Sequence, residues 1–271
     1  MVRLLLSVSV ILLLNACAKQ PYAASNKIYK TKVKALAKSI QTKAVPLQPN
    51  DIKQPTENIY TTNFGLRKPN MVILHYTAQN SCEQTLQTFT KPATEVSAHY
   101  VICKDGTLHQ LISDYLRAWH AGAGKWGNNA DVNSSSIGIE IDNNGIDSFS
   151  KAQLNTLTIL LASLKKQYNI PTTNFIGHSD IAPTRKIDPG TKFPWEALAK
   201  KGFGKWYADT STVQLPAGFN ATYALRIIGY DVTNVKAAIK AFKLHFIANN
   251  VTDDLNEAEQ KVLYAVMSQY L

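Results

Sequence analysis

Acidic residues are few in this 271-residue chain. It has 19 aspartates and glutamates against 29 lysines and arginines, so its formal net charge is +10. Such a charge favours anionic partners, among them nucleic acid, anionic lipid and anionic cell-wall polymer. The sequence also lacks a zinc finger, a basic zipper and an RNA-binding motif. Nucleic acid is therefore the least favoured of these partners.

Long hydrophobic runs are absent as well. The apolar run Leu4 to Leu14 is too short to cross a membrane as a stable helix. It follows a basic start and leads into Leu14-Asn15-Ala16-Cys17. This pattern predicts a bacterial lipoprotein signal, residues 1–16, cleaved before a lipidated Cys17; the alternative is a plain secretory signal with an incidental cysteine. Because Ala18 rather than aspartate follows, resemblance to sorted lipoproteins predicts the periplasmic face of the outer membrane.

Cysteine is scarce, with 3 residues in the chain. Apart from Cys17 there are only Cys82 and Cys103. An oxidising compartment permits a disulfide between them, and two buried free thiols are the alternative. Their spacing and apolar neighbours do not fit a zinc-binding pair.

The composition is otherwise that of a soluble globular protein without low-complexity tracts. The length allows one domain with ample core and a small additional module. Changes in composition predict a lysine-rich tether over 17–51, a main domain over 52–201, a linker over 202–218 and a helical module over 219–271. Lys32 to Ser39 could form a short helix within the tether. Its lysines could contact anionic lipid head groups, although solvated linker charge is the simpler interpretation.

Hydrophobic periodicity predicts strands alternating with helices in the main domain. The expected strands are 71–76, 98–103, 107–112 and 136–141, with an Asp-Gly turn between the second and third. Helices are expected from the cap Ser81 to Thr90 and over 152–168, each with a capping-box pattern. We therefore expect an α/β fold in which helices pack on a central sheet. In the C-terminal module we expect helices over 221–228, over 234–247 with Thr233 as cap, and from Asn256 to about 271.

A short loop from His178 to Asp188 carries the chemistry. Pro183 and the Pro189-Gly190 pair prevent a continuous helix, so this loop can bend back and bring His178 and Asp188 together. Both are zinc-ligand types, and a catalytic zinc usually has three protein ligands. The best third candidate is His75, at the end of the buried strand 71–76.

Three segments carry a family resemblance: those around His75, around Glu140 and from His178 to Gly190. Together they resemble the type 2 zinc N-acetylmuramoyl-L-alanine amidases, which share their fold with peptidoglycan recognition proteins and phage lysozyme-amidases. The match runs from about Asn58 to Trp195. It implies a central mixed sheet flanked by helices, with a small C-terminal three-helix module of peptidoglycan-binding type.

The resemblance also implies a reaction and a metal. Zn²⁺ held by His75, His178 and Asp188 would serve hydrolysis of the amide between N-acetylmuramic acid, or its anhydro form, and L-alanine of the stem peptide. Glu140 would be the general base, its alternative being a strand-end carboxylate paired with a lysine. Lys186 would stabilise the developing oxyanion.

Substrate contacts are expected from the glycine-rich loop 119–129 and from Arg185. Trp119 and His120 would line a groove for sugar rings, whereas the alternative is a loop pinned by tryptophans packed in the core. His120 also competes with Asp188 for the third ligand position. Arg185 could bind a stem-peptide carboxylate. The remaining histidines, His99, His109 and His245, are expected to be structural.

Two other functions are compatible with the pattern. A non-catalytic peptidoglycan-binding protein on the same fold would typically lack a zinc ligand, and all three are present here. A zinc peptidase that cuts within the stem peptide is disfavoured because the sequence has no His-Glu-x-x-His motif.

Overall fold

The computed structural model describes residues 21–40 and 66–271. The chain divides into two compact units, Met1–Tyr60 and Thr61–Leu271. The predicted signal, the lipidation site Cys17 and the start of the main domain lie outside the described residues. In the first unit, α1 (Ala23–Ser39) is longer than the predicted short helix and has no buried residue. Among the described residues, no helix is long and apolar enough to cross a membrane.

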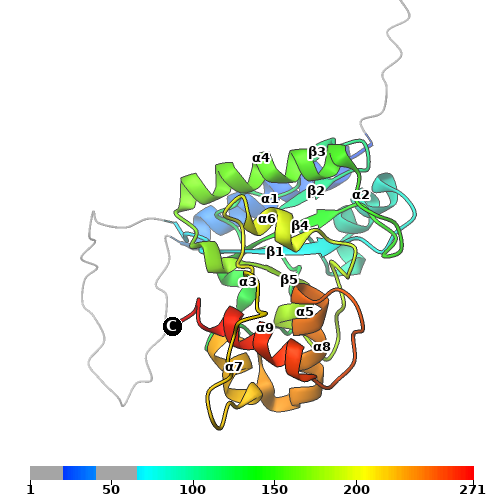
Figure 1. Ribbon diagram of the computed structural model, residues 1–271. Helices are drawn as coiled ribbons and strands as arrows, with labels where there is room; N and C mark the ends of the chain where they lie inside the picture. The colour runs from blue at the N-terminus through cyan, green and yellow to red at the C-terminus, as the bar shows by residue number, and fades with distance from the viewer. Residues whose placement is uncertain (1–20, 41–65) are drawn as a thin grey trace, which may run out of the picture. The chain divides into compact units, whose positions relative to one another are not determined.

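The second unit is built on a five-stranded sheet with the order β3-β2-β4-β1-β5 (Figure 1). The strands are β1 (Met71–Tyr76), β2 (Tyr100–Ile102), β3 (Leu108–Gln110), β4 (Ser136–Ile141) and β5 (Phe175–Gly177). β4 pairs in parallel with β1 and β2, and β1 in parallel with β5. Only the hairpin β2-β3 is antiparallel. The predicted mixed sheet is confirmed, with a hairpin whose strands are shorter than expected.

One face of this sheet packs against the long helix α4 (Lys151–Tyr168). Ile137, Ile139 and Ile141 of β4 join the apolar face of α4 in one hydrophobic cluster, together with Trp195 of α6 (Trp195–Ala199). The predicted capping box at Ser150 is present, with Gln153 as its partner. Because side chains alternate along a strand, the residues between the isoleucines face the other way. Those residues are Ser136, Gly138 and Glu140.

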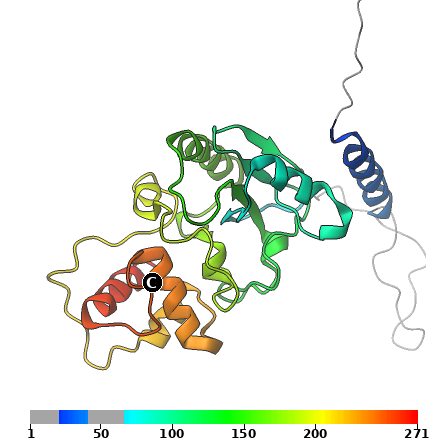
Figure 2. The same cartoon turned by 90° about the vertical axis from the view of Figure 1, so that its right-hand side faces the viewer.

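The opposite face packs against C-terminal helices (Figures 1 and 2). They are α7 (Ala221–Ile228), α8 (Val235–Phe246) and α9 (Glu257–Met267), and the 3-10 helix η3 (Val232–Asn234) precedes α8. Met71 and Ile73 of β1 share a hydrophobic cluster with these helices, so the predicted module and the sheet have a common core. The side chain of Asn234, not that of the predicted Thr233, accepts the capping hydrogen bond at the start of α8. Thr233 lies inside η3, which is itself capped by Asp231.

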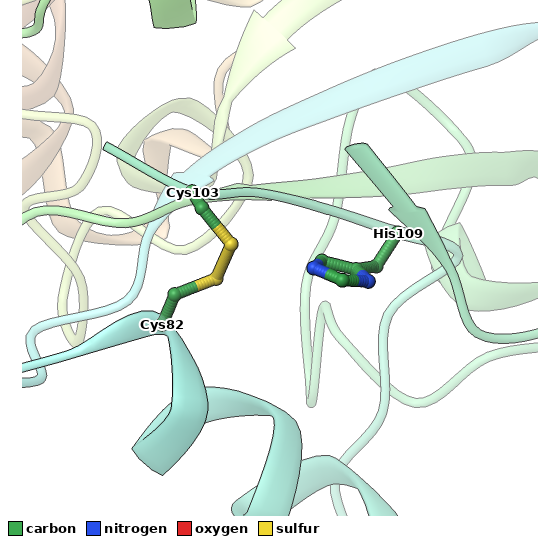
Figure 3. A group of neighbouring side chains, drawn as sticks. All are labelled: Cys82, Cys103 and His109. Carbon is green, nitrogen blue, oxygen red and sulfur yellow. A yellow bond between two sulfur atoms is a disulfide. The ribbon is translucent and has the colours of Figure 1, made fainter. Parts of the chain in front are cut away.

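The remaining elements of this unit are short helices between and after the strands. They are α2 (Cys82–Thr90, capped by Ser81 as predicted), η1 (Pro92–Thr94), α3 (Val132–Ser135), η2 (Thr172–Asn174) and α5 (His178–Ile181). A disulfide joins Cys82 at the start of α2 to Cys103 after β2, and His109 of β3 lies beside it (Figure 3). This settles the choice that the sequence left open. Since the two sulfurs are bonded to each other, they are not available as thiolate ligands.

Candidate metal centre and active site

The candidate site lies where three parallel strands end. His75 is near the carboxyl end of β1, Glu140 occupies the paired position on β4, and His178 directly follows β5. Parallel strands present their carboxyl ends at the same edge of a sheet, and ligand sites form there in α/β folds. The sheet therefore brings together residues that are far apart in the sequence.

The loop after β5 bends back as the prolines predict. The Ser179 amide donates to the carbonyl of Asp188 at 2.8 Å, which closes the loop. The amides of Arg185 and Lys186 both donate to the carbonyl of Ala182, at 2.9 and 3.0 Å. These bonds return the Asp188 side chain to the start of the loop, beside His178.

Three potential ligand atoms converge at this point. Nδ1 of His75 lies 2.9 Å from Nδ1 of His178, and Oδ2 of Asp188 lies 3.2 and 3.1 Å from these two atoms. All three residues are buried. A tetrahedral zinc with bonds of about 2.0–2.2 Å separates neighbouring ligand atoms by about 3.3–3.6 Å, slightly more than here. The donor set and its spacing thus fit a zinc ion.

The protonation of His178 suits this role. Its other ring nitrogen, Nε2, lies 3.2 Å from the carbonyl oxygen of Ala121. A carbonyl only accepts, so Nε2 carries the hydrogen and a neutral ring leaves Nδ1 bare toward the site. Burial lowers the pKa of His75 to about 4, so this ring is neutral at pH 7.

Glu140 lies beside the three ligand atoms. Its Oε1 is 4.0 Å from Nδ1 of His75, and its Oε2 is buried without a hydrogen-bond partner in the described part of the chain. Burial, with a further contribution from Asp188, raises the pKa of Glu140 well above its ordinary value. Lys186 opposes this rise through its positive charge, which places it within electrostatic reach of the site. Among the described residues Glu140 forms no ion pair with a lysine. The alternative of a strand-end carboxylate paired with a lysine is therefore not supported.

His120 lies in a different place from the predicted groove lining. Only 8% of the residue is exposed, and it sits behind His75, with Nδ1 at 3.1 Å from Nε2 of His75. Its own Nε2 lies 3.1 Å from the Ser136 hydroxyl. Its ring nitrogens thus face His75 and Ser136, and it is not one of the three converging residues.

The other predicted substrate contacts divide between surface and core. Trp119 is 48% exposed, whereas Trp126 of the same loop is buried against Tyr230. The loop is therefore pinned by one tryptophan and presents the other. Nη2 of Arg185 donates to the carbonyls of Ala121 and Ala123, at 3.2 and 2.8 Å, so this guanidinium holds the loop. Its contact with a substrate carboxylate stays a prediction.

Sequence reasoning missed the residues that support the site. Asp180, fully buried, accepts hydrogen bonds from the Gly177 amide, the Tyr230 hydroxyl and Nδ1 of His245. Asn133 accepts from the amides of His120 and Ala121. The only sequence signal was the alternation of isoleucine with Ser136, Gly138 and Glu140, which indicates a polar face. His99 and His245 have structural partners, as expected.

Comparisons with known proteins agree with this geometry. A family model described as N-acetylmuramoyl-L-alanine amidase matches residues 65–191. The N-acetylmuramoyl-L-alanine amidase AmiD of Escherichia coli K12 is 30% identical over 232 residues, which cover 74% of this chain and 83% of the relative. The chain belongs to the N-acetylmuramoyl-L-alanine amidase family. The family-model match, residues 65–191, covers the whole sheet and all residues of the candidate site.

Two solved family members share most of the fold. The complex of E. coli AmiD with anhydro-N-acetylmuramic acid-L-Ala-D-gamma-Glu-L-Lys has a TM-score of 0.68 at 26% identity, covering 83% of this chain and 97% of that one. AmpDh3 of Pseudomonas aeruginosa in complex with anhydromuramic pentapeptide has a TM-score of 0.67 at 28% identity, covering 84% and 99%. The E. coli 1,6-anhydro-N-acetylmuramyl-L-alanine amidase AmpD is 39% identical over 100 residues, 37% of this chain and 55% of AmpD.

Proposed function

We propose that this protein is a zinc-dependent amidase that hydrolyses the bond between N-acetylmuramic acid, or its anhydro form, and L-alanine of the peptidoglycan stem peptide. The observation that carries the proposal is the convergence of His75, His178 and Asp188 beside the buried Glu140. Family membership supports the reaction type. The relatives solved with anhydromuramyl peptides support a muropeptide as substrate.

His75, His178 and Asp188 would hold the metal through two nitrogens and one carboxylate oxygen. When bound, zinc would supply a Lewis acid that polarises the scissile carbonyl and lowers the pKa of water. This donor set also occurs in iron oxygenases, but the family and its hydrolytic reaction favour zinc.

Glu140 would move the proton. Hydrolysis of an amide requires a group that takes a proton from water and delivers one to the leaving amine. A carboxylate whose pKa is raised by burial can hold that proton between the two steps, and the Oε2 atom of Glu140 has no competing partner among the described residues.

Lys186 would stabilise charge that develops on the carbonyl oxygen. Its ammonium group acts on both Glu140 and His75 through its positive charge. Such a group stabilises an oxyanion more than the neutral carbonyl, which lowers the barrier. Trp119 and Arg185 would contact the sugar and the stem peptide.

We further propose that the protein is anchored by lipid on Cys17 at the periplasmic face of the outer membrane, where peptidoglycan is within reach. The Leu-Asn-Ala-Cys pattern supports this placement. Membrane fractionation and mass spectrometry of the mature amino terminus test it; an unmodified amino terminus at another residue would contradict it.

Mass spectrometry of purified muropeptides tests the reaction. Wild-type protein loaded with zinc is expected to release the intact stem peptide and a muramyl sugar without peptide. Chelated protein and Glu140→Ala are expected to release neither. Binding without cleavage would instead favour a peptidoglycan sensor, and cleavage within the stem peptide would favour a peptidase. Cleavage that persists in Glu140→Ala would refute the choice of base alone.

A further inference from the structure

A chain of buried hydrogen bonds leads from the body of the protein to His75. It starts at Ser136, whose hydroxyl lies 2.6 Å from the carbonyl oxygen of Val132. A carbonyl has no hydrogen to give, so the Ser136 hydroxyl must donate at this short distance. Its single hydrogen is thereby used, and its oxygen faces the next group as an acceptor.

That next group is Nε2 of His120, at 3.1 Å from the Ser136 oxygen. Since this oxygen accepts, Nε2 of His120 carries the hydrogen. The ring is buried and no carboxylate is among its hydrogen-bond partners in the described residues, so it is neutral and its Nδ1 is bare. Bare Nδ1 then accepts from Nε2 of His75, at 3.1 Å.

The direction of each bond follows from the one before. His75 carries its hydrogen on Nε2, and therefore presents a bare Nδ1 to His178 and Asp188. From these directions we propose that His120 is a positioning residue, which holds His75 in the tautomer and orientation that ligate metal through Nδ1. This inference rests on the proposed zinc site.

The fold makes specific room for the His120 ring. A Cβ atom added to Gly138 would lie 2.3 Å from Cγ of His120, closer than any real contact. The backbone at Gly138 does not adopt a positive φ, so glycine is required here for space and not for conformation. One face of β4 thus carries Ser136, Gly138 and Glu140. Ser136 is the hydrogen-bond acceptor for His120, Gly138 leaves room for the His120 ring, and Glu140 is the proposed base.

The same loop also orients the second histidine ligand. The residue after His120 is Ala121, whose carbonyl accepts from Nε2 of His178. The amides of both loop residues donate to Oδ1 of buried Asn133, at 3.0 and 2.9 Å. One loop, held at one side chain, therefore sets both imidazoles with Nδ1 toward the metal. Partners of this kind typically contribute about 10- to 100-fold to metal affinity.

Zinc affinity of matched variants tests the role of His120. In His120→Leu the acceptor for His75 is lost, and we expect the zinc Kd from chelator competition to rise roughly 10- to 100-fold. In His120→Asn an amide oxygen can replace Nδ1, and we expect the Kd to stay within about threefold of wild type. Far-UV circular dichroism of each metal-free variant checks that it folds.

The tautomer itself can be measured without any variant. In ¹⁵N-histidine-labelled wild-type protein without metal, NMR is expected to show the His75 hydrogen on Nε2. A hydrogen on Nδ1 would overturn the proposal, even if His120→Leu fails to fold. The position of this hydrogen depends on the hydrogen bond between His75 and His120. The measurement therefore distinguishes a positioning role of His120 from a role in which its ring only fills space.

The outcomes separate this inference from the proposed function. If wild type binds no zinc, the metal site itself fails. If wild type binds zinc and folded His120→Leu binds it equally well, only the positioning role is wrong. A raised KM for muropeptide with unchanged zinc Kd would return His120 to the substrate groove that the sequence suggested.

Discussion

Lys186 and Glu140 have opposite electrostatic roles in the proposed mechanism. In the proposed mechanism Glu140 holds a proton. Burial raises its pKa, while the positive charge of Lys186 lowers it. Neither is one of the three converging residues, so either can be changed without removing a proposed zinc donor atom.

Replacement of Lys186 by glutamine should therefore affect rate more than metal binding. We expect kcat to fall roughly 10²- to 10³-fold, because stabilisation of the developing oxyanion is lost. The zinc Kd should change by less than about threefold, in contrast with Asp188→Asn, which removes a ligand. Steady-state kinetics on a defined muropeptide and chelator competition measure the two quantities. Equal losses of kcat and zinc affinity would show that Lys186 supports the metal site instead.

Five of the six histidines of this chain show how much a residue's role depends on its neighbours. His75 and His178 converge on a carboxylate, and His120 supports one of them. His99 accepts from the Gly138 amide, and His245 pairs with Asp180. In the sequence these imidazoles are alike, and only the partners of each ring nitrogen distinguish them.

Helix α5 is a four-residue element that carries the proposed metal ligand His178 at its first position and the buried carboxylate Asp180 at its third. Asp180 holds the amide of Gly177, directly before His178, at 2.7 Å. It also binds Tyr230 and His245, which belong to the C-terminal helical region. The C-terminal helices thereby hold the turn that presents His178.

Asp180→Asn should weaken both the fold and the metal site. The substitution puts an amide NH2 where a carboxylate oxygen accepts hydrogen bonds from buried donors, and a buried donor left unpaired typically costs about 1–3 kcal/mol, so we expect a loss of that order in the free energy of unfolding. Zinc affinity should fall as well, because the turn before His178 loosens. The matched control is Asp253→Asn, whose ion pair with Lys236 is exposed and should contribute at most about 1 kcal/mol. Urea unfolding compares the two, and an equal small loss would contradict the role of Asp180.

The disulfide links two other elements, the start of α2 and the end of β2. Cys82 and Cys103 are 21 residues apart. Closing a loop of this length stabilises the folded state by about 3 kcal/mol in the chain-entropy description. We expect the double variant Cys82→Ala/Cys103→Ala to lose this amount in urea unfolding, and wild type with a reducing agent to behave alike. No difference between oxidised and reduced wild type would argue against the bond.

At the scale of the whole molecule, one sheet serves two cores. Isoleucines of β4 face α4, while Met71 and Ile73 of β1 face the C-terminal helices. The face of the sheet opposite α4, which carries the candidate site, is therefore packed against residues C-terminal to the family-model match at 65–191. We expect residues 219–271 to contribute to the stability of the unit that carries the candidate site.

Buried histidines make the stability of the metal-free protein depend on pH. Burial lowers the pKa of His75 and His99 to about 4 and that of His120 well below its ordinary value, whereas it raises that of Glu140. Below about pH 6.5 these three histidines become protonated in the unfolded chain but stay neutral in the folded chain. The folded chain keeps a proton on Glu140 that the unfolded chain releases above about pH 4.5.

The net excess of two protons in the unfolded chain sets the sign. The free energy of unfolding should therefore fall by roughly 2 kcal/mol per pH unit as the pH drops from about 6 to 5. Urea unfolding of chelated protein at several pH values measures this slope. His99→Gln should reduce the slope by about one proton, or about 1.4 kcal/mol per pH unit. A flat profile in this range would contradict the assignment of neutral buried rings.

Several of the main elements and the three converging residues could be predicted from local sequence patterns and the family resemblance. Apolar periodicity and capping residues placed β1, β4, α4 and α7, because these signals are local. Three motifs in order were sufficient to point to the family and to His75, His178 and Asp188. The cap of α8 was misplaced by one residue, since two neighbouring side chains can each cap a turn.

The groups that support the site became evident only from long-range packing. The side-chain partners of His120 are Ser136 and His75, and those of Asp180, Tyr230 and His245, lie 50 and 65 residues away, so no local sequence pattern predicts them. The choice between disulfide and free thiols likewise depended on whether α2 and β2 meet. A hydrogen bond requires donor and acceptor within about 3 Å, and long-range packing alone determines which side chains come that close.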